Sequence, residues 1–187
     1  MDGQPSVVVV SGHMVDAPER PRPRFPPDQV PRVAAAVREA LDAWGVGAST
    51  TLITSGARGA DLLAAEAARE RGAKVRMLLA LPPDEFEERS VALPGTDWAD
   101  RFRAMLSTAE VEVVEHLPDA DVFEGTNARI IEVARALDPE PFALIVWNGQ
   151  EGDGPGGTRD FVSRLGYSMP DPRVRVIDPT PPAGFLD

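Results

Sequence analysis

The stretch Thr51–Gly72, TLITSGARGADLLAAEAARERG, decides the fold of this chain. Its first residues, Thr51–Thr54, are apolar and β-branched, which is typical of a buried strand. The following Ser55–Asp61 has the composition of a tight glycine-containing turn, and Asp61–Arg71 that of a helix ended by Gly72. A strand, a glycine-rich turn and a helix are together the parts of a phosphate-binding βα unit.

Two glycines in this turn decide how it is interpreted. Gly56 and Gly59 lack the Cβ that would keep an anion off the backbone, and the new helix directs unpaired N–H groups at the same spot. The alternative is that both glycines only make a sharp turn. Arg58 is either a phosphate partner or a solvated turn residue. Asp61 would repel a phosphate, so it either braces the turn or contacts a ribose hydroxyl.

The same alternation of strand and helix continues along the chain, and it predicts an α/β fold: a three-layer Rossmann-like domain with a mainly parallel sheet. We expect further strands over Ser6–Val10, Lys74–Leu81, Val111–Val114, Phe142–Trp147 and Val174–Ile177. We expect further helices over Gln29–Trp44, Asp84–Arg89, Trp98–Thr108, Asn127–Leu137 and Thr158–Leu165.

Two proline-rich segments lie outside these elements. Ala17–Pro31 is crowded with proline and arginine and is expected to be an exposed loop, and Pro179–Asp187 is expected to be a tail over the surface. No interior linker divides the chain, so residues 1–187 are expected to form a single domain.

Three loops rich in glycine or polar residues each follow a predicted strand. They are Ser11–Asp16, Ser55–Asp61 and Asn148–Thr158, and five glycines fall within Gly149–Gly157. Because the carboxyl ends of parallel strands share one edge of a sheet, these loops should gather there and form a small-ligand site. The residues expected to bind the ligand are Ser11, Gly12, His13, Ser55, Gly56, Arg58, Gly59, Ala60, Asp61, Trp147, Asn148, Gly154, Gly156, Gly157 and Thr158.

Several single residues have two interpretations. His13 either contacts the ligand, with Asp16 orienting its ring, or closes the end of the first strand. Trp147 ends a strand beside the site, which favours stacking on a base. The remaining candidates are expected to be structural: Trp98 in the core, Asn127 as a helix cap and His116 between strand and loop.

Three motifs, in order, resemble the SLOG superfamily, the Rossmann-like group that includes LOG-type nucleotide hydrolases. They are Ser11-Gly12-His13, the GARGAD stretch Gly56–Asp61, which is similar to YspA/YpsA-type members, and Gly154–Thr158 at a late helix start. The resemblance covers most of Ser6–Ile177. It implies a pocket for a nucleotide or nucleotide derivative over the sheet edge.

The resemblance also implies where a catalytic acid should stand. LOG enzymes carry a Pro-Gly-Gly-x-Gly-Thr-x-x-Glu motif whose glutamate assists cleavage of an N-glycosidic bond. With Thr158 on the motif threonine, Phe161 falls on the glutamate and Asp160 lies one residue early. One residue turns a helical side chain by about 100°, so Asp160 is a poor substitute. Glu87 or Glu88 is the other candidate acid.

Composition excludes several classes of function. The 30 acidic residues outnumber the 19 basic ones, which gives a net charge of -11 and argues against general nucleic-acid binding. There is no cysteine, and the two histidines have no metal-ligand spacing, so neither metal nor cofactor is expected. Without a signal peptide or a membrane-length apolar run, we expect a cytoplasmic protein with no membrane partner; a homo-oligomer is left open.

Three functions are compatible with these features. The first is a sensor or recognition domain for a nucleotide-derived small molecule, AMP- or ADP-ribose-like. The second is a LOG-type nucleoside-monophosphate phosphoribohydrolase, and the third is an interaction scaffold with a vestigial pocket. The missing motif glutamate favours the first over the second, and the intact glycine loops argue against the third.

Overall fold

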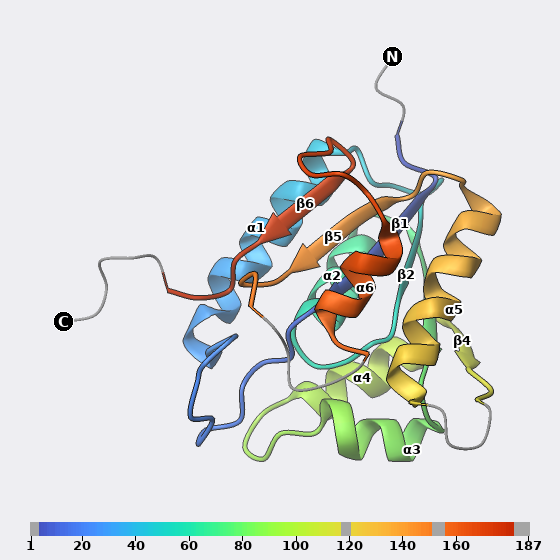
Figure 1. The fold of residues 1–187 in the computed structure, drawn as a ribbon. Coiled ribbons are helices and arrows are strands. Elements are labelled where there is room, and N and C mark those ends of the chain that lie inside the picture. The colour runs from blue at the N-terminus through green and yellow to red at the C-terminus, as the bar shows by residue number, and fades with distance from the viewer. Residues whose placement is uncertain (1–3, 117–120, 151–155, 182–187) are drawn as a thin grey trace.

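The chain is built on one parallel sheet. In the computed structural model, which describes residues 4–116, 121–150 and 156–181, six strands run in the same direction in the order β4-β3-β2-β1-β5-β6 (Figure 1). The strands are β1 (Val7–Gly12), β2 (Thr51–Thr54), β3 (Lys74–Leu79), β4 (Glu110–Val113), β5 (Phe142–Val146) and β6 (Val174–Ile177). The predicted α/β fold with a parallel sheet is confirmed.

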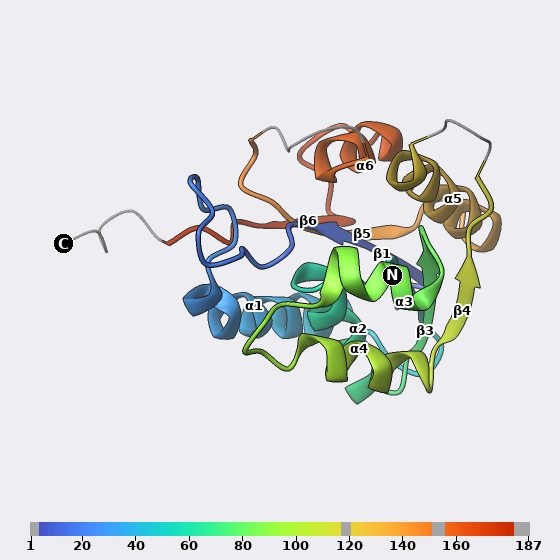
Figure 2. The ribbon, with the colours of Figure 1, turned by 90° about the horizontal axis from the view of Figure 1, so that it is seen from below.

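Helices cover both faces of this sheet. One face carries α1, α2 and α4, and the other carries α5 and α6 (Figure 2). The helical segments are η1 (Pro27–Gln29), α1 (Val30–Ala43), α2 (Ala60–Glu70), α3 (Pro83–Phe86), α4 (Trp98–Leu106), α5 (Val122–Leu137), α6 (Thr158–Leu165) and one turn of π-helix, η2 (Glu87–Val91). None of the helices in the described ranges is long and apolar enough to cross a bilayer.

The central strand shows why the sheet forms. Val8 and Val10 pack into the core under α1, α2 and α4, whereas Val7 and Val9 pack into the core under α5 and α6. Successive side chains of a strand point to opposite faces, so a strand covered on both sides must be apolar at every position. The continuous apolar run is therefore the sequence signature of a central position in the sheet.

The strand order reverses at β1. The chain adds β2, β3 and β4 on one side of β1, and then crosses over to place β5 and β6 on the other side. In open α/β sheets the crevice outside the carboxyl ends at such a reversal is the usual ligand position. The fold therefore predicts a ligand site at the carboxyl ends of β1 and β5.

Several element boundaries differ from those expected, and two of these differences have a clear physical cause. α5 begins at Val122 rather than at Asn127, because Asp121 accepts hydrogen bonds from the Phe123 and Glu124 amides and is the true N-cap. β1 continues to Gly12, since both Ser11 and Gly12 pair with β5.

The segment Ala17–Pro31 is less exposed than expected. Phe25 is fully buried, and the Asp16 carboxylate accepts hydrogen bonds from the amides of Arg24 and Phe25. The buried Asp16 therefore holds this proline-rich segment against the domain instead of orienting His13. Near the other end of the chain, Arg32 donates to the carbonyls of Asp178 and Thr180; the predicted tail lies partly outside the described residues.

Candidate functional site

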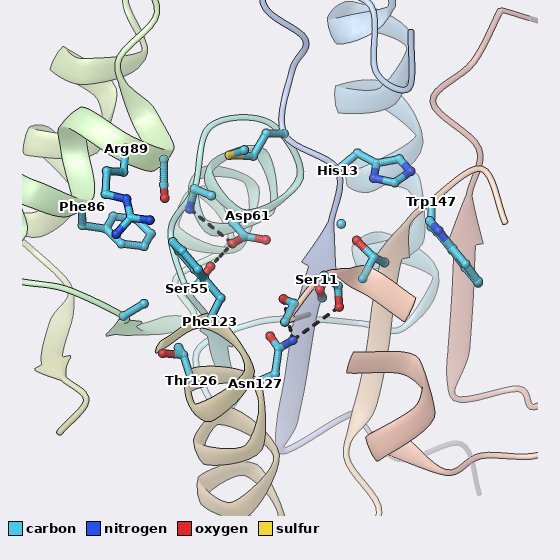
Figure 3. A pocket seen from close by; sticks show the side chains of 18 of the residues that line it. Ser11, His13, Ser55, Asp61, Phe86, Arg89, Phe123, Thr126, Asn127 and Trp147 are labelled. Atoms are coloured by element: carbon cyan, nitrogen blue, oxygen red, sulfur yellow. Dashed lines mark hydrogen bonds between the residues drawn. The ribbon is translucent and has the colours of Figure 1, made fainter. Parts of the chain in front are cut away.

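A cavity of about 320 Å³ opens at the carboxyl ends of β1, β2, β3 and β5 (Figure 3). Its size is at the lower end of the range for small-molecule sites, roughly 300–1,000 Å³. The structure brings together here most of the residues that the sequence singled out: Ser11, Gly12, His13, Ser55, Asp61, Trp147, Gly156, Gly157 and Thr158. Gly154 lies outside the described residues.

Asp61 is the carboxylate among the described lining residues. It lies in the first turn of α2 and is 5% exposed. Its Oδ2 accepts a hydrogen bond from the Ser55 hydroxyl and another, at 3.2 Å, from the Ala57 amide, so Asp61 braces the turn after β2. Burial raises the pKa of the Asp61 carboxyl to about 6, against the opposing effect of these hydrogen bonds.

His13 lies across the cavity beside Trp147 (Figure 3). Its Nε2 lies 2.9 Å from the Asn148 side-chain oxygen, which also accepts from the Gln150 amide. That oxygen is already an acceptor, so His13 Nε2 is the donor and Nδ1 is left as an acceptor in the neutral ring. Burial lowers the pKa of His13, which favours this neutral form. Trp147 Nε1 donates to the Gln150 carbonyl and so fixes the indole.

The glycine-rich loop before α6 is held by Asn127. This side chain donates to the Gly156 carbonyl at 2.8 Å and to Asp160 Oδ2 at 3.0 Å. Asn127 lies more than one turn inside α5 and faces the cavity, so its predicted role as a helix cap is wrong. It is instead the link between α5 and the loop that leads to Thr158.

The expected substitute acids lie outside the cavity lining. Asp160 is bound by Asn127 and by Arg164 Nε at 2.8 Å, and Glu87 pairs with Arg103 on the surface. Phe161, at the position of the motif glutamate, is fully buried in the core under α5 and α6. In the described ranges, no cluster of three or more His, Asp or Glu side chains is arranged to hold a metal ion.

The sequence pointed to the side of the cavity formed by α3 and η2 only through the candidate acids Glu87 and Glu88, and it did not identify the residues that line the cavity there. Phe86, Arg89 and Ser90 line the cavity there, and the Arg89 guanidinium stacks over the Phe123 ring at 5.4 Å. The Ser90 carbonyl accepts from the Arg58 amide, which fastens η2 to the turn after β2. No short-range pattern could indicate this arrangement, because it depends on contacts between segments about thirty residues apart.

The glycines of the GARGAD turn face protein and not the cavity. A Cβ at Gly59 would lie 2.8 Å from the His13 carbonyl oxygen and 2.8 Å from the Val15 amide nitrogen, so Gly59 permits the close approach of two loops. Arg58 Nε donates to the Val15 carbonyl at 2.9 Å. The expected residues that do not line the cavity are Gly56, Arg58, Gly59, Ala60 and Asn148.

The fold and the site define a Rossmann-like α/β protein with a cavity at the point where the strand order reverses. No family model and no curated protein matches the chain. Solved structures that match include the structural-genomics target TM1055, at 15% identity and a TM-score of 0.46 over 86% of this chain and 68% of that one. Another is DNA processing protein A (DprA) from Streptococcus pneumoniae, at 15% identity and a TM-score of 0.43 over 93% of this chain and 58% of that one. At these values the likeness carries no argument about ligand or activity, and membership of the SLOG superfamily stays a prediction from the motifs.

Proposed function

We propose that this protein binds a nucleotide or nucleotide-derived small molecule, AMP- or ADP-ribose-like, as a sensor or recognition domain. The observation that carries the proposal is the position of the cavity. It lies where the strand order reverses, and residues at the starts of α2, α5 and α6 line it. The amides at the start of α5 are capped by Asp121, and the first amide of α2 donates to the His13 carbonyl. The start of α6, which no side chain of the described residues caps, is therefore the helix end that favours a ligand with an anionic group.

Arg89 is the cation we assign to the phosphate. The side chain is exposed at the edge of the cavity, and its guanidinium stacks on the Phe123 ring. No carboxylate in the described part of the chain pairs with it. A guanidinium held over a ring keeps its donors available for an anion.

The aromatic lining suits a base. Trp147 is half-buried at the cavity, and its indole is fixed by the hydrogen bond to Gln150. A fixed indole face is a low-entropy platform for stacking. Phe86 and Phe123 supply apolar surface on the side of Arg89.

Binding without cleavage is the outcome that the positions of the acids favour. Cleavage of an N-glycosidic bond develops positive charge on the sugar, which a carboxylate must stabilise. Asp160 and Glu87 are engaged by arginines outside the cavity lining, and Phe161 is in the core. Asp61 does line the cavity, but it is not at the motif position, and its Oδ2 is held by the turn after β2. We therefore expect no adenine when AMP is incubated with the protein and the mixture is separated by chromatography. Enzyme-dependent release of adenine would instead support the phosphoribohydrolase.

Calorimetric titration with AMP, ADP-ribose and adenosine tests the binding. Replacement of Arg89 by Gln should weaken AMP binding by about tenfold, because a charged hydrogen bond to phosphate is lost, and should leave adenosine binding unchanged. The matched control is Arg38→Gln, which removes the same charge from an exposed pair with Glu70. If neither AMP nor ADP-ribose binds to the wild-type protein, the proposed function is wrong.

A further inference from the structure

The two carboxylate oxygens of Asp61 have different surroundings. Oδ2 is engaged by the turn, through the Ser55 hydroxyl and the Ala57 amide. Oδ1 is buried and makes no hydrogen bond of normal geometry within the described part of the chain. The Thr54 hydroxyl, which is also buried without a partner, and the Gly56 amide lie near enough to this carboxyl to oppose the rise of its pKa. In Figure 3 this oxygen points away from Ser55, toward the middle of the cavity that Asp61 lines. Most buried polar atoms of native proteins have a partner, so an unpartnered acceptor in a cavity indicates that a ligand supplies the donor.

We propose that Asp61 determines the specificity of the cavity: Oδ1 accepts a hydrogen bond from a hydroxyl or amino group of the bound nucleotide, while Oδ2 holds the turn. The inference rests on the proposed nucleotide site and adds the orientation of the ligand in it. An ionised carboxylate only accepts hydrogen bonds and repels phosphate. The phosphate is therefore kept away from the Asp61 carboxylate itself, and the part of the ligand that carries a donor lies there.

The opposite arrangement, in which a protonated Asp61 donates to the ligand, differs in its dependence on pH. With a pKa of about 6, Asp61 is mostly ionised at pH 7.5 and mostly protonated at pH 5.0. A ligand that donates to Asp61 binds the ionised form, so its affinity falls by about tenfold between these two pH values. A ligand that accepts from Asp61 binds more tightly as the pH falls.

Other charged groups also face the cavity. They are Arg24 from the proline-rich segment, Arg89 from η2 and His13 at the end of β1. Both arginines stay cationic over this range. Protonation of His13 at low pH strengthens the binding of an anion, which opposes the effect expected from Asp61. The pH profile must therefore be compared with that of a variant that keeps His13 and lacks only the carboxylate.

The decisive variant is Asp61→Asn, whose side chain has nearly the same shape. Its amide nitrogen replaces one of the two carboxylate oxygens: at the Oδ1 position it presents a donor to the ligand, and at the Oδ2 position it removes the acceptor that holds the turn. We expect its affinity for AMP at pH 7.5 to fall at least tenfold, and the component of the pH profile assigned to Asp61 to disappear. The control is Glu66→Gln on the same helix, whose carboxylate pairs with Arg101 outside the cavity lining, and which should bind AMP like the wild type. Titrations with 2′-deoxy-AMP and with IMP then distinguish the sugar hydroxyl from the amino group of the base.

The outcomes separate this inference from the proposed function. If the wild type binds AMP and Asp61→Asn binds it equally well, the inference is wrong and the proposed function stands. If the wild type binds none of these nucleotides, both are wrong. Should Asp61→Asn fail to fold, the carboxyl ¹³C signal of Asp61 in the wild type decides. Its pKa falls on addition of AMP if the ligand donates to Oδ1, and a rise or no change overturns the inference.

Discussion

Replacing Asp61 by Asn should stabilise the unliganded protein, and the gain should grow with pH. The carboxyl has a pKa of about 6 in the folded protein, against 3.8 in an unperturbed aspartate. The folded state therefore holds this proton more tightly than the unfolded chain. The stability that Asp61 contributes is fully present below pH 3.8 and is lost as the pH rises through about 6.

The magnitude follows from the two pKa values. The rise of the pKa from 3.8 to about 6 corresponds to roughly 3 kcal/mol of unfavourable free energy once Asp61 is ionised. Over the experimental range from pH 5.0 to pH 7.5, about 1.4 kcal/mol of this free energy is expressed. An amide at the same position carries no charge to bury, although it makes weaker hydrogen bonds with Ser55 and Ala57.

Urea denaturation of the wild type and of Asp61→Asn at pH 5.0 and pH 7.5 measures this effect. The difference in unfolding free energy between the two proteins should be larger at pH 7.5, in favour of the variant, by about 1.4 kcal/mol. Comparing the two proteins cancels the contributions of other titrating groups. One of these is Asp171, whose pKa is held down by Arg173 and which therefore stabilises both folded proteins as the pH rises. A difference that does not change with pH, or one that favours the wild type more at pH 7.5, would refute the reasoning.

Three further substitutions test the structure. Gly59→Ala should cost roughly 1–3 kcal/mol in urea denaturation because of its φ of 99° and the crowding backbone of the loop after β1; Gly45→Ala, with open space around it, is the control and should cost less. Asp121→Ala should lower the unfolding free energy by about 1 kcal/mol through loss of the α5 N-cap, and an unchanged midpoint would contradict that role. Phe161→Glu should unfold the domain, as seen by circular dichroism, because it buries a charge in a fully closed core; a folded variant that releases adenine from AMP would contradict our placement of α6.

The sequence was sufficient to predict the fold because the sheet is buried on both faces. Runs such as Val7–Val10 have no polar position, and a run of this kind is stable only between two layers of helices. Strand–helix alternation then fixes parallel pairing and handedness, so the layers could be derived without tertiary information. The start of α5 was missed because Asn127 and Asp121 are both good capping residues, and only the hydrogen bonds distinguish them.

The site was only partly predictable, since its walls depend on packing. The rule that the carboxyl ends of parallel strands share one edge of the sheet correctly predicted that His13 and Asp61 lie together there. The turn glycines were expected to receive an anion, but the side chain of Met77 and the backbone around Val15 occupy the space beside them. Arg89 was missed because its position depends on how η2 folds back onto the turn after β2.

The glycine-rich loop resembles that of a hydrolase, but the helix that follows it, α6, places no acidic side chain in the cavity. The rotation of α6 about its axis explains this difference. Thr158, Phe161 and Leu165 are the buried residues of this helix, at a spacing that places them on one face. The position that would carry the motif glutamate is therefore a core position here, and Asp160 is turned toward Asn127 and Arg164. The cavity carboxylate is supplied instead by α2, from the opposite face of the sheet, with one oxygen already bound to the turn. A group held in this way is suited to orient a ligand, which supports the proposed role in recognition.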